Sequence, residues 1–141
     1  MKASVPYFSY GSNMAPAGME ERCSAPSVLG VAAVPGYQFR IAKRGYATMV
    51  PDRGSMVYGL LWSLADEDLA ALDQYEGVPA GHYTRTTIPV QFRGKPLEAQ
   101  VYLAADPAPG TPRPGYLETV VQAARNLGLP PEYIAVLEGG A

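Results

Sequence analysis

The stretch Met56-Val57-Tyr58-Gly59-Leu60-Leu61-Trp62 is the part of this sequence that decides its fold. It is apolar at odd and even positions alike, so a strand formed from it would bury both faces, as a central strand does. The run is also far too short to cross a lipid bilayer. We therefore expect it to lie in the middle of a sheet.

Further strand-like segments lie on both sides of this run. They are bounded by Gly and Pro or show alternating apolar residues, and they cover residues 5–10, 27–34, 37–42, 47–50, 82–92 and 97–103. The last two predict a hairpin that closes near Arg93-Gly94-Lys95. Pro89 indicates that the first strand of this hairpin has an edge position or a bulge.

Helices are predicted for Pro16 to Arg22, for Asp66 to Tyr75 and from Gly115 to Asn126, with a last short turn that opens at Pro130-Pro131. Six or seven strands with a few peripheral helices indicate an α+β protein with a small, mixed, barrel-like sheet. With 141 residues, the chain is expected to form a single domain, residues 1–141.

Composition and charge exclude several classes of protein. The net charge of −2 and a pI of about 5.3 argue against nucleic-acid binding. The lone cysteine, Cys23, excludes a disulfide framework, and the lone histidine, His82, excludes a His-rich metal centre. The N-terminus has no apolar targeting segment, so a cytoplasmic protein without membrane or metal is expected. Ten Tyr and a low charged fraction leave room for a homodimer interface.

One glutamate breaks the pattern of the predicted helix at 66–75. At helical spacing, one stripe holds Ala65, Leu69, Leu72 and Glu76, so Glu76 occupies a position where a core residue is expected. Gly77 follows as a natural residue just past the helix end. Burial and the negative helix terminus would both raise the pKa of Glu76, as general acid–base catalysis near neutral pH requires. The alternative is a solvated residue at a frayed helix end.

The segment Tyr10-Gly11-Ser12-Asn13 joins a predicted strand to a helix. Free backbone N–H groups at such a turn can bind a carboxylate or a phosphate, although an ordinary connecting turn is the simpler interpretation. Tyr83 and Tyr116 follow turns and could direct a hydroxyl into a cleft or only pack. Four arginines are candidates for binding a substrate carboxylate, and the sequence does not choose among Arg40, Arg44, Arg53 and Arg85.

Six short motifs occur in series along nearly the whole chain. They are Tyr10-Gly11-Ser12-Asn13, Leu72-Asp73-Gln74-Tyr75-Glu76-Gly77, Tyr83-Thr84-Arg85, Tyr102-Leu103, Pro112-Arg113-Pro114-Gly115-Tyr116 and Gly128-Leu129-Pro130-Pro131-Glu132-Tyr133. Together they resemble the γ-glutamylcyclotransferase family, with Arg113 where that family commonly has Ser.

The resemblance implies a reaction that needs no cofactor. The α-amine of a small γ-glutamyl substrate attacks its own γ-carbonyl, which gives 5-oxoproline and a free amine or amino acid. By this resemblance Glu76 is the catalytic acid–base, and the substrate is held by Tyr10, Gly11, Ser12, Asn13, Tyr83 and Tyr116. The Tyr-Gly-Ser-Asn form is more similar to relatives that act on γ-glutamyl amino acids than to those that act on γ-glutamylamines.

Two other functions compete with this one. A binding or interaction domain of the same fold would have the pocket without turnover. Amide hydrolysis with Cys23 as nucleophile and His82 as base would need these two side chains next to each other.

Overall fold

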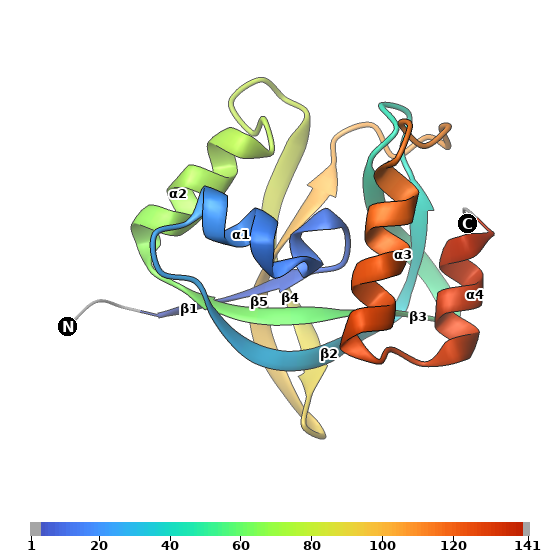
Figure 1. The fold of residues 1–141 in the computed structure, drawn as a ribbon, viewed down its shortest axis with the longest axis horizontal. Coiled ribbons are helices and arrows are strands. Elements are labelled where there is room, and N and C mark those ends of the chain that lie inside the picture. Colours follow the sequence, from blue (N-terminus) through green and yellow to red (C-terminus); the bar gives the residue numbers. More distant parts are fainter. Residues whose placement is uncertain (1–3, 140–141) are drawn as a thin grey trace.

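The computed structural model describes residues 4–139, which form five strands and four α-helices (Figure 1). The strands are β1 (Val5–Ser9), β2 (Ser27–Ile41), β3 (Ala47–Leu64), β4 (Tyr83–Phe92) and β5 (Lys95–Ala104). The helices are α1 (Pro16–Arg22), α2 (Asp66–Tyr75), α3 (Tyr116–Leu127) and α4 (Pro131–Glu138), and a short 3-10 helix, η1, covers Ser12–Met14.

The five strands close into a ring in the order β1-β3-β2-β4-β5. The neighbours pair antiparallel, except that β1 and β5 meet through one parallel bridge between Tyr7 and Gln100. In the hairpin of β4 and β5, Phe92 pairs with Lys95, which leaves the predicted Arg93-Gly94 turn between them. The α+β class is confirmed.

The prediction of six or seven strands was wrong, because two pairs of expected strands are each continuous. The segments expected at 27–34 and 37–42 are both parts of β2, and those at 47–50 and 56–62 are both parts of β3. Between Pro35↔Met56 and Tyr37↔Pro51 the pairing of β2 with β3 shifts its register. Residues 52–55 therefore form a bulge in a bent strand pair, and the turn-like residues there do not end either strand.

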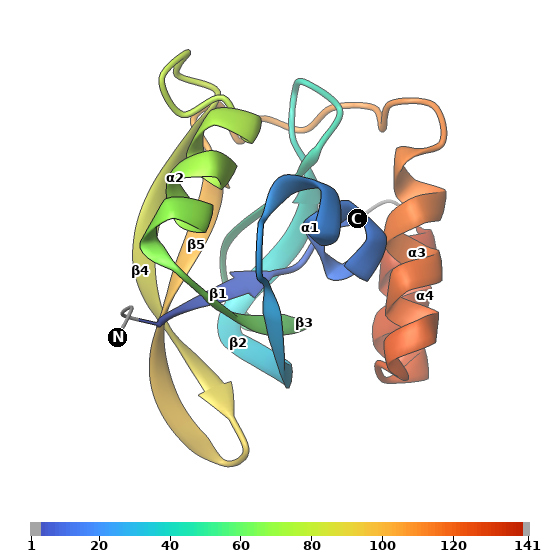
Figure 2. The ribbon, with the colours of Figure 1, turned by 60° about the vertical axis from the view of Figure 1, so that its left-hand side comes forward.

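The apolar run at 56–62 is central, as predicted, since β3 pairs with β1 on one side and with β2 on the other. Val57, Leu60, Leu61 and Trp62 are buried. The C-terminal helices cover part of this region, where the rings of Tyr58 and Tyr133 meet edge to face with centroids 5.1 Å apart. Figure 2 shows α3 and α4 side by side on one side of the ring and α2 on the opposite side.

The predicted helices all form, and α4 is longer than the single short turn expected at Pro130-Pro131. Among the described residues, no helix is long and apolar enough to cross a membrane.

Candidate active site

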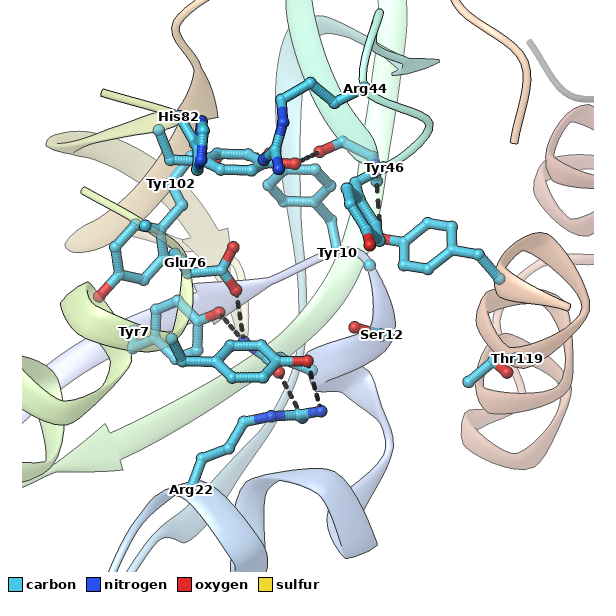
Figure 3. Close-up of a pocket in the computed structure, with 17 residues that line it drawn as sticks. Tyr7, Tyr10, Ser12, Arg22, Arg44, Tyr46, Glu76, His82, Tyr102 and Thr119 are labelled. Atoms are coloured by element: carbon cyan, nitrogen blue, oxygen red, sulfur yellow. Dashed lines mark hydrogen bonds between the residues drawn. The ribbon is translucent and has the colours of Figure 1, made fainter. Parts of the chain in front are cut away.

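A cavity of about 420 Å³ lies between the ring and the helices (Figure 3). Its walls are formed by Tyr7, Tyr10, Gly11, Ser12, Asn13, Arg22, Arg44, Tyr46, Ala47, Tyr75, Glu76, Gly77, His82, Tyr83, Tyr102, Tyr116 and Thr119. All seven residues that the family resemblance assigned to catalysis or substrate binding are in this set. Glu76 contributes the only carboxylate among these lining residues.

The end of α2 places Glu76 in the cavity wall. Glu76 is the C-cap of the helix, and Gly77 follows in the left-handed region with a φ of 74°. The N–H of Val78 donates to the carbonyl of Asp73 at 2.9 Å, and the N–H of Gly77 donates to the carbonyl of Gln74 at 3.1 Å. These two bonds form a Schellman motif, so the helix ends abruptly and does not fray.

The carboxylate of Glu76 is in an unusual electrostatic environment. Burial raises the pKa of Glu76 to about 7, and the nearby Arg22 charge and the Asn13 hydrogen bond only partly oppose this increase. Its side chain is largely shielded, so the geometry does not support the alternative of a solvated glutamate. A group with this pKa can both accept and donate a proton near neutral pH.

A hydrogen-bond network links the Glu76 carboxylate to η1 and α1. The side-chain amide of Asn13 donates to Glu76 Oε1 at 3.3 Å and to the Tyr7 hydroxyl at 2.9 Å (Figure 3). The Arg22 guanidinium donates to Asn13 Oδ1 at 2.8 Å and to the Tyr75 hydroxyl at 2.6 Å. The same guanidinium lies over the Tyr75 ring, 3.9 Å from its centroid. Arg22 therefore determines the orientation of the Asn13 amide.

Ala47, at the start of β3, positions two of the tyrosines. Its N–H donates to the Tyr116 hydroxyl at 3.2 Å, and its carbonyl accepts a hydrogen bond from the Tyr83 hydroxyl at 2.6 Å. Burial raises the pKa of Tyr83 and brings that of Tyr116 to about 12, so both hydroxyls remain protonated at neutral pH.

The turn that follows β1 packs closely against Tyr116 of α3. A Cβ built on Gly11 would lie 2.7 Å from the Tyr116 hydroxyl oxygen and 3.3 Å from the Ala47 Cβ, so a residue with a side chain would displace one of them. The backbone and side chain of Ser12 lie near the Tyr116 hydroxyl and lower its pKa, against the larger effect of burial.

The four candidate arginines have different surroundings, and one of them lines the cavity. Arg44 lines the cavity, and Arg40 donates instead to the carbonyl of Pro107 at 3.1 Å. Arg85 makes two hydrogen bonds to Asp73, at 2.8 and 3.2 Å, which tie β4 to α2. Arg53 is exposed in the bulge of β3 and does not line the cavity.

Sequence reasoning missed several lining residues, among them Tyr7, Arg22, Tyr46 and Tyr75. Arg22 meets Tyr75 across 53 residues of sequence, so no local motif links them. The available signal was the position of Arg22 at the end of the helix that directly follows the Tyr10–Asn13 turn.

The arrangement does not support a cysteine nucleophile. His82 lines the cavity, but Cys23 does not. Burial raises the pKa of the Cys23 thiol to about 11, whereas a nucleophilic cysteine needs a lowered pKa. Within residues 4–139, no group of three or more His, Cys, Asp or Glu side chains is placed to hold a metal ion.

The fold and the cavity define a class of small α+β proteins in which a cavity beside a closed ring of strands is lined by one carboxylate and several tyrosines. Residues 56–137 match the sequence model of the AIG2-like family. The chain is 30% identical over 138 residues to a mouse gamma-glutamylcyclotransferase and 28% identical to a human one, in each case over 90% of this chain and 73% of the relative. A solved structure of a gamma-glutamyl cyclotransferase superimposes with a TM-score of 0.89 at 26% identity, covering 96% of this chain and 87% of that one. The chain therefore belongs to the AIG2-like, or γ-glutamylcyclotransferase, family.

Proposed function

We propose that this protein is a γ-glutamyl cyclotransferase that converts a γ-glutamyl amino acid or amide into 5-oxoproline and a free amine. The observation that carries the proposal is Glu76, which is the only carboxylate among the cavity's lining residues and has a pKa near 7. The mouse and human relatives, which carry the name of this activity, support the same conclusion.

The reaction is an internal exchange of one C–N bond for another. The α-nitrogen forms a bond to the γ-carbon, and the bond between the γ-carbon and the leaving nitrogen breaks. The α-ammonium group loses two protons in becoming the lactam N–H, and the leaving nitrogen gains two in becoming a free ammonium group, so no external reactant is required. Because the nucleophile and the electrophile belong to the same molecule, the protein only has to bring the α-nitrogen close to the γ-carbon and to transfer protons.

Glu76 performs the proton transfer in this proposal. As a carboxylate it accepts a proton from the α-nitrogen, and as a carboxylic acid it passes that proton to the leaving nitrogen, so that the C–N bond can break. Asn13 holds the carboxylate through its 3.3 Å hydrogen bond. The Tyr10–Asn13 turn binds the γ-glutamyl part, and the protonated hydroxyls of Tyr83 and Tyr116 line its surroundings.

Release of 5-oxoproline from γ-glutamyl amino acids, γ-glutamylamines and glutathione tests the proposal. We expect release by the wild type and a loss of roughly 10²–10⁴-fold in Glu76→Gln, since the amide cannot exchange a proton at neutral pH. Glu132→Gln is the matched control, because Glu132 is exposed in the first turn of α4. Full activity in Glu76→Gln would refute the mechanism, and binding without release by the wild type would favour a non-catalytic binding domain.

A further inference from the structure

A second cavity of about 410 Å³ adjoins the first. It is lined by Ala42, Lys43, Arg44, Tyr46, Gly81, His82, Tyr83, Ala104, Ala105 and Asp106. Four of these residues also line the first cavity, namely Arg44, Tyr46, His82 and Tyr83. These four residues therefore form the boundary between the two cavities.

Arg44 is the strongest unused binding group at this boundary. Among residues 4–139, no carboxylate pairs with its guanidinium, which lies over the Tyr46 ring with 5.8 Å between Cζ and the ring centroid. Its backbone is held in place, because the Arg113 side chain donates to the Arg44 carbonyl at 3.0 Å. Figure 3 shows the Arg44 side chain pointing into the cavity near His82 and Tyr46.

The other charges of the second cavity are less suited to bind a ligand. Lys43 and Asp106 are 3.9 Å apart, and their side chains are 71% and 57% exposed. Arg44 is exposed as well, so the difference within the described part of the chain is that Lys43 already faces a carboxylate of the protein and Arg44 does not. At the opposite end of the first cavity, the Arg22 guanidinium is already engaged by Asn13 and Tyr75.

We propose that the second cavity receives the leaving group of the substrate, and that Arg44 binds a carboxylate carried by this leaving group. The inference rests on the proposed function, which places the α-amine of the substrate at Glu76, and it adds that the scissile amide lies between Glu76 and the shared residues. Arginine can bind a carboxylate through two parallel N–H···O bonds, which fix its orientation as well as its charge. Leaving groups that are amino acids should therefore be preferred over simple amines.

A matched pair of substrates tests this assignment. The leaving groups of γ-glutamylalanine and γ-glutamylethylamide differ only by one carboxylate. We expect the wild type to prefer γ-glutamylalanine in kcat/KM by roughly 10–100-fold, the effect of a hydrogen bond to a charged group. In Arg44→Gln this ratio should fall to within about threefold of unity, and Arg44→Lys should retain part of it. Arg53→Gln is the control, since that exposed arginine lines neither cavity and the ratio should not change.

Two outcomes would overturn the assignment. Equal losses for both substrates in Arg44→Gln, with an unchanged melting temperature, would place Arg44 on the γ-glutamyl part of the substrate. Equal kcat/KM values of the wild type for the two substrates would show that no group of the protein binds the leaving-group carboxylate.

Dissociation constants of the two compounds, measured by calorimetry in Glu76→Gln, separate this inference from the proposed function. A preference in binding that depends on Arg44 would support the leaving-group site even if the wild type released no 5-oxoproline, whereas absence of that preference would refute it.

Discussion

The two ends of the cavity differ in how completely their polar groups are satisfied. At the Glu76 end, formed by Tyr7, Asn13, Arg22 and Glu76, every side chain takes part in one hydrogen-bond network. At the Arg44 end, where the adjoining second cavity adds Lys43 and Asp106 to Arg44 and His82, the one ion pair among these four residues spans 3.9 Å and is exposed.

This difference matches the demands of the two tasks. Proton transfer requires reacting groups that are held in position before the substrate binds, and the hydrogen-bond network around Glu76 provides this. The cost is a carboxylate buried away from water, which destabilises its charged form. Recognition of a leaving group has no such requirement, because the substrate itself can complete the hydrogen bonds of Arg44.

The largest expected effect concerns the stability cost at the Glu76 end. The pKa of Glu76 is about 7 in the folded protein against an ordinary value of 4.5, so the folded state binds this proton more tightly than the unfolded chain. The resulting stabilisation is fully present below pH 4.5 and is lost as the pH rises to about 7. The total loss is at most roughly 3 kcal/mol.

Urea unfolding of wild type and Glu76→Gln between pH 4.5 and 8 measures this cost. Because glutamine does not titrate, the variant should gain stability relative to the wild type across that range, and Glu132→Gln should follow the wild type. If the free energy of unfolding changes with pH in the same way in the wild type and in Glu76→Gln, Glu76 is not desolvated. The Glu76 end would then carry no stability cost that the Arg44 end lacks.

The next effect concerns the turn that carries Asn13. In Gly11→Ala, the new methyl group would lie 2.7 Å from the Tyr116 hydroxyl oxygen, so the turn or α3 must move. We expect a loss of about 1–3 kcal/mol in the free energy of unfolding, with reduced activity.

The double variant Gly11→Ala/Tyr116→Phe provides the control, because it removes the oxygen that the methyl group meets. It should be more stable than Gly11→Ala in urea unfolding. A double variant as unstable as the sum of its single variants would show that the contact with Tyr116 is not the cause.

The smallest effect concerns Arg22. Its positive charge lowers the pKa of Glu76, so Arg22→Gln should raise that pKa and move the acidic limb of the pH–rate profile to higher pH. At pH 7 a few-fold loss of kcat is expected, with recovery at higher pH. Arg125→Gln is the control, since Arg125 forms an exposed pair with Glu138. A uniform loss at every pH would indicate a structural role for Arg22 and no electrostatic one.

The sequence by itself determined the features that depend on short-range geometry. Helical spacing predicted α2 and the place of Glu76 on its apolar stripe, and Gly77 predicted where that helix ends. The double-sided apolar pattern of 56–62 likewise predicted a central strand. Such patterns succeed because neighbours along a helix or strand have a fixed orientation relative to one another.

Only the tertiary structure decided the features that depend on closure of the ring. Pairing between β2 and β3 continues past the bulge at residues 52–55, so turn-like residues there did not end the strands. Closure also brought Asn13 to Glu76 across 63 residues and selected Arg44 from four similar arginines. The reason is physical: a contact between distant segments depends on the path of the whole backbone, and no local spacing of residues encodes that path.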